Sequence, residues 1–477
     1  GGGLATSGGL TVTIQGNKIY DNRAGNNGGG GFFGAGGSYY FRDNDVYGNQ
    51  APDGNGGGMS IVAVVTYVSA TNNLVHDNLA GTAGGGIDVV AIIGGAEFSG
   101  DSVYANKAIT GGGLHAAMFF GVANLVDVRL YDNQAQQSGG GAFLSGGFAA
   151  SALTGTHVYS NSAGWDGGGM FFNFGGSVDL YGNYVYGNRA GRDGGGVFSS
   201  LGSADLNSTN DVVAGNQAGQ FGSGMALNAD EQSDILVKHA TIARNTGGDG
   251  SGIHAALSST VQVSNTIIVS HAVGITVAQG CKATLQNTLW ASGTAWANLT
   301  NWAGGGTINT ISNYGGDPKF VAPDLYDYHI MAGSAARDQG MDAGVNTDID
   351  RQARPQGAAP DLGADEYPAS CTAPTSITVS GPATVTVGTV NPFTATVDPA
   401  DATPALTYLW ERTGASSLLH PNSLAVTDTA HLTWDAVGTQ RITVTVYNPC
   451  GTAQASREVT VRQGKRYVYL PLVMRNR

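Results

Sequence analysis

The stretch GGGMFFNFGGSVDLYGNYVYGN, residues 167–188, contains in one unit the pattern that decides the fold. A glycine cluster opens the unit, an apolar residue follows, and an apolar-Tyr-x-Asn sequence closes it. The glycine cluster returns every 27 or 28 residues, at Gly1, Gly28, Gly56, Gly84, Gly111, Gly139, Gly167, Gly194, Gly222 and Gly250. The asparagine returns in phase with it, at Asn22, Asn49, Asn78, Asn106, Asn133, Asn161, Asn188, Asn216 and Asn245. Two registers that hold over this length indicate a solenoid repeat.

Each repeat contains three short segments in which apolar and polar residues alternate, as they do in β-strands. Like residues that return in every repeat predict parallel stacking at roughly 4.8 Å per coil. We therefore expect an all-β fold, a right-handed, single-stranded parallel β-helix of about ten to twelve coils of roughly 28 residues, over residues 1–314. The glycine and asparagine rows are expected to be architectural, the asparagines forming a ladder of amides between coils.

The signatures GGGMFF (167–172) and VYGN (185–188) resemble the GGAI and FxxN repeats of polymorphic outer-membrane proteins and related bacterial β-helix adhesins. The resemblance covers about residues 1–275 and implies a secreted bacterial β-helix. It is specific for the fold and weak for the function, because such helices also include polysaccharide lyases and hydrolases.

The periodicity fails after Trp290, and residues 315–368 differ in character. The runs GGDPKFVAPDLYDYHIMAGSAARDQG (315–340) and TDIDRQARPQGAAPDLGADEY (347–367) are similar to the choice-of-anchor Q module, which ends β-helices in secreted bacterial proteins. The resemblance implies a cap over the last coil, whose backbone groups would otherwise be unpaired. In this cap we expect Arg354 to pair with a carboxylate such as Asp361. Calcium binding by the acidic residues is the alternative interpretation, and we expect neither a metal nor a cofactor.

Residues 369–463 contain short Thr- and Val-rich segments bounded by turns, which predict a β-sandwich. Their TYLW and WDAVGTQRITVTVYN sequences resemble a PKD or immunoglobulin-like domain, with Trp410 as its buried core aromatic. Cys371 and Cys450, at the two ends of this domain, are a candidate disulfide, which leaves Cys281 as a small core residue.

The tail, residues 464–477, is a short apolar run between basic residues. It resembles the C-termini of secreted proteins of Chloroflexota-like bacteria. It is either an added edge strand of the sandwich or a strand that pairs with, or sorts to, something else.

The composition argues against several kinds of partner. Only 12% of the 477 residues are charged, and the net charge is −13. Nucleic acids and anionic membranes attract basic patches, so we expect neither as a partner. The sequence has no run of 18 apolar residues that would span a membrane. With the candidate disulfide, this acidic and lysine-poor composition predicts a secreted protein, extracellular or at the cell surface.

A lyase or hydrolase would need acidic groups clustered on one outward face of neighbouring coils. The recurring aspartates instead occupy turn positions, which Asp favours for conformational reasons, so we expect no catalytic residues and no enzyme. A better candidate is the row that strand alternation turns outward after the glycines. It contains Phe33, Ser60, Asp88, His115, Phe143, Phe171 and Phe198. Phe143, Phe171 and Phe198 would form an exposed aromatic ladder that meets a glycan, a cell surface, another subunit or the chain's own C-terminal sandwich, and packing within the molecule is the alternative.

Three functions are compatible with these features. The first is an extracellular structural protein, a self-assembling filament or surface-layer subunit that forms homo-oligomers. The first repeat has no visible cap, so we expect an open β-edge at Gly1 and Leu4. The candidates to cover this edge from a neighbouring subunit are the tail residues Tyr467, Tyr469, Leu470 and Leu472. The second function is an adhesin that uses the aromatic ladder, and the third is a polysaccharide lyase or hydrolase.

Overall fold

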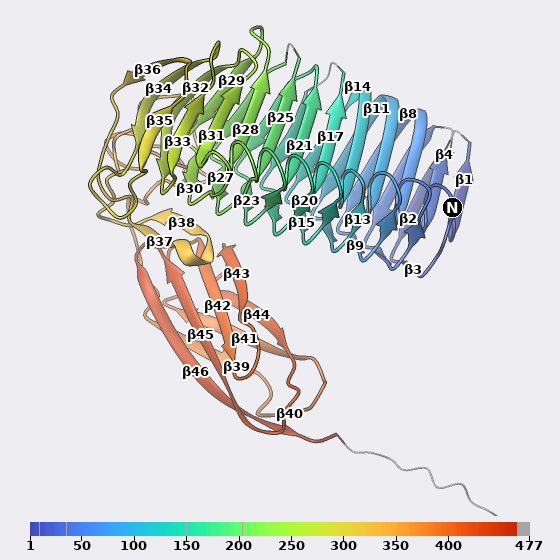
Figure 1. The fold of residues 1–477 in the computed structure, drawn as a ribbon. Coiled ribbons are helices and arrows are strands. Elements are labelled where there is room, and N and C mark those ends of the chain that lie inside the picture. The colour runs from blue at the N-terminus through green and yellow to red at the C-terminus, as the bar shows by residue number, and fades with distance from the viewer. Residues whose placement is uncertain (9, 35, 148–149, 203, 465–477) are drawn as a thin grey trace, which may run out of the picture. The chain divides into compact units, whose positions relative to one another are not determined.

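The computed structural model describes residues 1–464 apart from 9, 35, 148–149 and 203. The chain divides into two compact units, the first of residues 1–319 and 333–367, the second of residues 320–332 and 368 onward. The first unit is a right-handed parallel β-helix of about 11 turns, which confirms the predicted fold (Figure 1). The segment 315–368 is divided between the two units.

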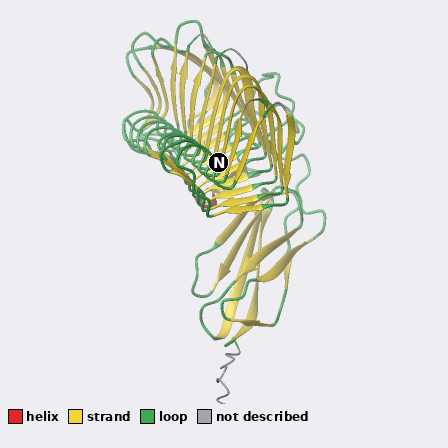
Figure 2. Ribbon diagram, turned by 90° about the vertical axis from the view of Figure 1, so that its right-hand side faces the viewer, coloured by secondary structure: helices red, strands yellow, loops and turns green. Residues whose placement is uncertain are grey.

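The β-helix has three faces of parallel strands that stack in register (Figure 2). The first face contains β1 (Leu4–Ser7), β4 (Gly31–Gly34), β17 (Ala142–Gly146), β21 (Met170–Phe174), β25 (Val197–Leu201), β28 (Met225–Ala229), β31 (Ser251–Ala256), β33 (Val273–Val277) and β35 (Thr300–Ala303). The second contains β2 (Leu10–Gln15), β5 (Gly37–Arg42), β18 (Ser151–Thr154), β22 (Val178–Tyr181), β26 (Leu206–Thr209), β29 (Asp234–Lys238) and β36 (Thr307–Ile311). The third contains β3 (Lys18–Tyr20), β6 (Asp45–Tyr47), β9 (Leu74–His76), β12 (Ser102–Tyr104), β15 (Arg129–Tyr131), β19 (His157–Tyr159), β23 (Tyr184–Tyr186), β27 (Val212–Ala214) and β30 (Thr241–Ala243).

Two features of the strands are not apparent from the repeat pattern. In several coils one long strand bends over two faces. These are β8 (Met59–Thr71), β11 (Ile87–Ser99) and β14 (Leu114–Val126) on the first and second faces, and β32 (Thr260–Val269) and β34 (Lys282–Leu289) on the second and third. A further ladder of two-residue strands contains β7 (Gln50–Ala51), β10 (Leu79–Ala80), β13 (Lys107–Ala108), β16 (Gln134–Ala135), β20 (Ser162–Ala163) and β24 (Arg189–Ala190).

The core of the β-helix consists of rows of apolar side chains that stack from coil to coil. One such row on the first face contains Ile61, Val89, Ala116, Leu144 and Phe172, each of them buried completely. Strand alternation puts these residues inside, because their chain neighbours point to the opposite side of the strand. Burial of a large apolar side chain contributes about 1.5–3 kcal/mol, so the repeat itself supplies the stability of the helix.

The second unit begins with a hairpin and continues as two sheets around one apolar core. The hairpin contains β37 (Phe320–Ala322), the 3₁₀ helix η1 (Pro323–Leu325) and β38 (Asp327–Ile330). One sheet contains β39 (Ser376–Ser380), β41 (Asn391–Asp398) and β44 (Thr427–Leu432). The other contains β40 (Thr384–Thr386), β46 (Gly451–Arg462), β45 (Gly438–Asn448), β42 (Leu406–Arg412) and β43 (Leu418–Ser423). Trp410 is 1% exposed between the sheets, and a disulfide joins Cys371 to Cys450. Cys281 is buried in the β-helix as a free thiol.

Candidate functional site

The nine asparagines of the repeat form one continuous ladder at a corner of the β-helix. In each step the side-chain Nδ2 of one asparagine donates to Oδ1 of the next, as from Asn133 to Asn161 at 3.0 Å. The same Nδ2 also donates to a backbone carbonyl of the preceding coil, here that of Val103 at 2.8 Å. The ladder runs from Asn22 to Asn245 and continues through His271 to Asn298. These buried amides are therefore occupied within the fold, which makes their role architectural.

A second ladder of amides follows another corner, and the sequence interpretation missed it. Asn17, Asn44 and Asn73 repeat the same bonding, and the row continues to Asp101, whose Oδ1 accepts from Asn73 at 2.8 Å. Oδ2 of Asp101 is buried and has no hydrogen-bond partner among the described residues. Burial raises the pKa of Asp101 to about 6. The signal was present in the sequence, since these residues follow one another at 27 to 29 residues.

We predict that Asp101→Asn stabilises the protein, because it puts an amide at a position of this row that holds a carboxylate with an unpartnered oxygen. The pKa of Asp101 is raised in the folded state, so the unfolded state loses its proton first as the pH increases. Below about pH 4 the Asp101 carboxyl is neutral in both states and does not destabilise the folded protein. The destabilisation grows between about pH 4 and pH 6 and is constant above pH 6. We expect a gain of about 2 kcal/mol at pH 8 and almost none near pH 4, measured by urea unfolding.

Asp211→Asn is the matched control for this prediction. Asp211 is also completely buried, and burial raises its pKa to about 6 as well. However, its Oδ2 accepts a 2.6 Å hydrogen bond from the hydroxyl of Ser208, so the carboxylate is better compensated. We expect a smaller gain from Asp211→Asn, and an equal loss of stability in both variants would contradict the interpretation.

The outward row of the first face carries a serine, an aspartate and a histidine on consecutive coils. The hydroxyl of Ser60 donates to Oδ2 of Asp88 at 3.1 Å, and Nδ1 of His115 lies 2.7 Å from Oδ1 of the same carboxylate. In a catalytic triad the imidazole lies between the nucleophile and the carboxylate and removes the proton from the nucleophile. Here the carboxylate lies between the other two groups. The arrangement therefore orders the row and does not activate Ser60.

The three phenylalanines of the same row stack on one another but are less accessible than predicted. The ring centroids of Phe143 and Phe171 are 4.6 Å apart, and those of Phe171 and Phe198 are 4.9 Å apart. Phe143 and Phe171 are partly buried, and Phe198 is only 7% exposed. The glycine turn before each strand covers the ladder: a Cβ at Gly194 would lie 2.7 Å from that of Phe198. The expectation of an exposed aromatic ladder is therefore corrected, and the stacked faces of these rings are not available to a sugar.

The assignment of Phe33 to this outward row is wrong. Phe32 pairs with Ser60 in the row, whereas Phe33 pairs with Ile61 and is buried completely in the core. The cause is the additional glycine of this coil: Gly31 takes the inward position that Met59 holds in the next coil.

A longer aromatic stack lies on the third face, next to the asparagine ladder. Its ring centroids are 4.7–5.2 Å apart and its rings are parallel to within 7°. It contains Tyr20, Tyr47, His76, Tyr104, Tyr131, Tyr159 and Tyr186. Burial raises the pKa of Tyr159 to about 12, so its hydroxyl stays neutral. The stack presents ring edges and hydroxyls to solvent, and its contacts stabilise the register of the coils.

The segment of residues 338–366, here called the lateral segment, lies along one corner of the β-helix. Thr347 accepts from Asn210 and contacts Tyr181, while the backbone of Met341 and Gln339 accepts from Asn265 and Asn287. Asn210, Asn265 and Asn287 occupy one position of the repeat, with His239 on the coil between the first two, and Tyr181 lies one residue before this position on an earlier coil. The segment therefore covers the side of several coils, which corrects the expected cap over the last coil.

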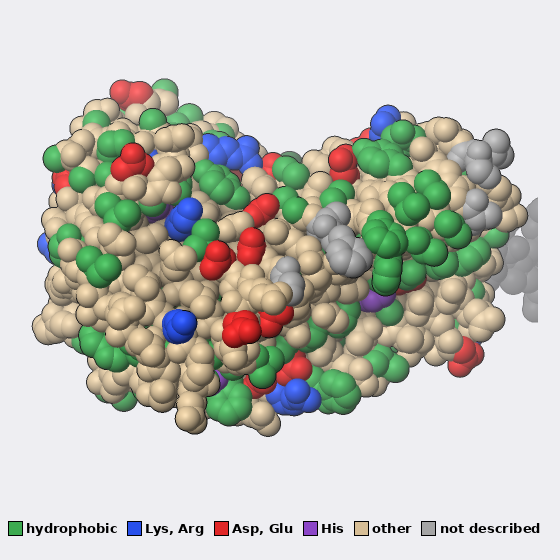
Figure 3. Space-filling view, turned by 90° about the horizontal axis from the view of Figure 1, so that it is seen from above, with side chains coloured by type: hydrophobic (Ala, Val, Ile, Leu, Met, Phe, Trp, Pro, Cys, Tyr) green, Lys and Arg blue, Asp and Glu red, His purple; other side chains and the backbone are tan. Residues whose placement is uncertain are grey.

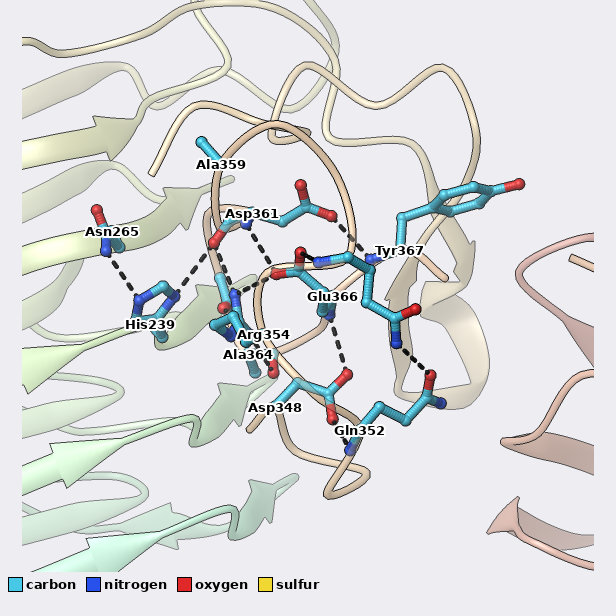
Figure 4. Close-up of polar contacts among 12 residues, drawn as sticks. His239, Asn265, Asp348, Gln352, Arg354, Ala359, Asp361, Ala364, Glu366 and Tyr367 are labelled. Atoms are coloured by element: carbon cyan, nitrogen blue, oxygen red, sulfur yellow. Dashed lines mark hydrogen bonds and ion pairs between the residues drawn. The ribbon is translucent and has the colours of Figure 1, made fainter. Parts of the chain in front are cut away.

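Arg354 organises the lateral segment, with a different partner from the predicted one (Figure 4). Its Nη1 lies 3.1 Å from Oε2 of Glu366, and both side chains are fully buried. The guanidinium also donates to the backbone carbonyls of Asp361, Gly363 and Ala364. The pairing with the carboxylate of Asp361 is thus wrong, because that carboxylate accepts from the backbone N–H groups of Asp338 and Tyr367. Burial and the nearby Glu366 raise the pKa of Asp361 to about 7.

An apolar surface at the corner between the first and second faces was not recognised from the sequence. Six side chains on three consecutive coils are 46–62% exposed: Val64, Val65, Ile92, Ile93, Phe119 and Phe120. Four of them, Val64, Ile92, Phe119 and Phe120, line an open groove of about 1060 Å³, here called the apolar groove. Figure 3 shows apolar side chains gathered in such a patch on this side of the molecule. The missed signal was two apolar residues in succession where alternation calls for a polar one.

The groove continues beyond these side chains over three further coils, where small and polar residues line it. They are Ser145, Gly146, Gly147, Asn173, Gly175 and Gly202, together with the aromatic Phe174. The next turn of the helix stacks on the turn at Gly202, since the backbone N–H of Asp230 donates to the carbonyl of Leu201. This turn and its neighbour carry four acidic residues: Asp205, Asp230, Glu231 and Asp234. The groove is therefore apolar over its first coils, and an acidic turn lies next to its last coil.

The residues predicted for assembly are described only in part. Leu4 is 37% exposed in β1, which pairs with β4, and Gly1 is also exposed. The tail residues Tyr467, Tyr469, Leu470 and Leu472 lie outside the described residues. Among the described residues no helix is long and apolar enough to cross a membrane.

Comparison with known proteins supports the fold and leaves the activity open. Residues 120–289 match the family described as right handed beta helix region, which includes both enzymes and non-enzymes. Among solved structures, the chain is similar to the PKD domain of an M14-like peptidase from Thermoplasmatales archaeon SCGC AB-540-F20. That likeness has 21% identity and a TM-score of 0.17, and it covers 19% of this chain and 98% of the other. No curated protein matches the chain.

Proposed function

We propose that this chain is a structural protein of the cell exterior, in which the β-helix is a rod and copies of the chain associate with one another. The observation that carries the proposal is the use of the repeat's polar and aromatic side chains. Asparagines, tyrosines and phenylalanines all contact the same residue type in the next coil. Because these side chains are already engaged in contacts between coils, they support a structural function.

The pairing of the polar groups supports a non-enzymatic function. Ser60 lacks a contact with an imidazole in the row, since both Ser60 and His115 bond to Asp88. His254 is paired with Asp249 at 2.7 Å. It lies in the same row as Phe171, three coils further along the β-helix. A lyase or hydrolase requires several such groups around one substrate bond.

The disulfide supports a location outside the cytoplasm. The Cα atoms of Cys371 and Cys450 are 5.6 Å apart, within the usual range for a disulfide, and the bond closes a loop of 79 residues. Disulfides of this structural kind persist in oxidising compartments.

Sedimentation of the full chain tests the proposal. We expect the weight-average mass to rise above that of the monomer as the concentration increases over a roughly hundredfold range, because association follows mass action. Electron microscopy of the same samples should show discrete oligomers or filaments. A monodisperse monomer at every concentration would contradict the proposal, as would specific turnover of an acidic or neutral polysaccharide.

A further inference from the structure

The apolar groove is unusual on a chain whose other rows are satisfied by contacts between coils. Phe119 is 59% exposed and Val64 62%, although both lie in long strands of the β-helix. A contiguous apolar surface of this kind on a protein commonly marks a contact with another chain. The groove therefore calls for an occupant whose chemistry matches an apolar floor and a neighbouring acidic turn.

The chain itself contains a segment with this chemistry. Residues 467–474, YVYLPLVM, are apolar without interruption. They are flanked by Lys465 and Arg466 on one side and by Arg475 and Arg477 on the other, in a chain whose net charge is −13. The acidic turn at Asp230 to Asp234 is thus complementary to either end of this segment.

The length of the apolar groove also agrees with that of residues 467–474. The groove is lined from Val62 to Gly202, on six consecutive coils. Five steps at about 4.8 Å give a length of roughly 24 Å. Eight residues in an extended strand at about 3.3 Å each span roughly 26 Å. The apolar run would fill the groove and put its flanking cations next to the acidic turn.

We propose that the apolar groove binds residues 467–474 of a second copy of this chain. This contact rests on the self-association proposed above and specifies where the two copies touch. The choice of a second copy follows from the proposed self-association and from the basic residues that flank the tail in an otherwise acidic chain. The strand β46 starts next to Cys450, which is bonded to Cys371 at the entrance of the sandwich, and runs for 12 residues away from it. At about 3.3 Å per residue, residue 463 therefore lies roughly 40 Å from the disulfide.

Disulfide trapping between two copies tests this contact directly. One full-length chain carries Ile92→Cys in the groove and a second carries Leu472→Cys in the tail. On oxidation of the mixture we expect a cross-linked dimer, and no such product when Leu299→Cys replaces Ile92→Cys. Leu299 is a matched control because it is 87% exposed on the β-helix and does not line the groove.

Substitutions in the groove test its energetic contribution. We expect Ile92→Ser with Phe119→Ser to weaken self-association at least tenfold, whereas Leu299→Ser leaves it unchanged. Glu231→Lys should also weaken association and reduce its dependence on salt. Circular dichroism should show an intact fold, since all the replaced side chains are on the surface.

Two results would overturn the proposal in different ways. If the chain assembles but neither Ile92→Ser with Phe119→Ser nor Glu231→Lys changes the association constant, the contact is wrong and the proposed function stands. If one chain that carries both Ile92→Cys and Leu472→Cys gives only a cross-linked monomer, and the mixture gives no dimer, the tail binds its own groove and the second copy is excluded.

Discussion

Replacing Gly140 by alanine is expected to destabilise the β-helix by at least about 3 kcal/mol. A Cβ at this position would overlap the carbonyl oxygen of Gly168 and lie 2.7 Å from backbone atoms of Ser162, both in the next coil. Backbone atoms cannot move aside as a flexible side chain does. The two coils would have to separate, which breaks hydrogen bonds such as that from the Gly140 N–H to the Gly167 carbonyl.

Gly25→Ala is the matched control, because a Cβ there would meet no atom within 4 Å. Thermal unfolding followed by circular dichroism should show a much lower midpoint for Gly140→Ala and an unchanged one for Gly25→Ala. If Gly140→Ala fails to fold, it should be missing from the soluble fraction while Gly25→Ala is present in normal amounts. That result would also show that Gly140 is required for the close approach of the coils. Equal midpoints for Gly140→Ala and the parent chain would show that the glycine clusters are not required for the close approach of coils.

The β-helix and its ladders were predictable because translation relates one coil to the next. A residue that returns every 27 to 29 positions must meet its own counterpart, so the sequence period alone places Asn133 on Asn161. The same reasoning failed at Phe33, where four glycines in succession, residues 28–31, allow two alignments. Only the pairing of Phe32 with Ser60 decides between them.

Contacts without a period were not predictable in the same way. The lateral segment contains several carboxylates within reach of Arg354, and the sequence does not distinguish Asp361 from Glu366 as its partner. The partner of Arg354 depends on which carboxylate already accepts hydrogen bonds from backbone N–H groups. The carboxylate of Asp361 accepts from those of Asp338 and Tyr367. The apolar groove was missed for another reason: the pairs at Val64, Ile92 and Phe119 break the alternation, but a break in alternation does not say whether a residue is covered.

Arg354→Met is expected to destabilise the protein by about 3–5 kcal/mol, because it removes one partner of a fully buried ion pair. The carboxylate of Glu366 would remain buried without its cation, and the carbonyls of Asp361, Gly363 and Ala364 would lose their donor. Urea unfolding measures the loss. Limited proteolysis should in addition locate it, with new cleavage within the lateral segment while the coils stay resistant.

Arg351→Met is the matched control within the same segment. Arg351 lies 3.0 Å from Asp127, but the two side chains are 63% and 55% exposed, so water already solvates this pair. Exposed ion pairs contribute about 0–1 kcal/mol, and we expect a change no larger than that. The double variant Arg354→Met with Glu366→Gln should recover part of the lost stability, because it removes the buried charge and the amide oxygen still accepts from one of the N–H groups of Gln356 and Asp361, although its NH2 cannot accept from the other. If Arg354→Met and Arg351→Met lower the stability equally, the buried pair does not hold the lateral segment on the β-helix.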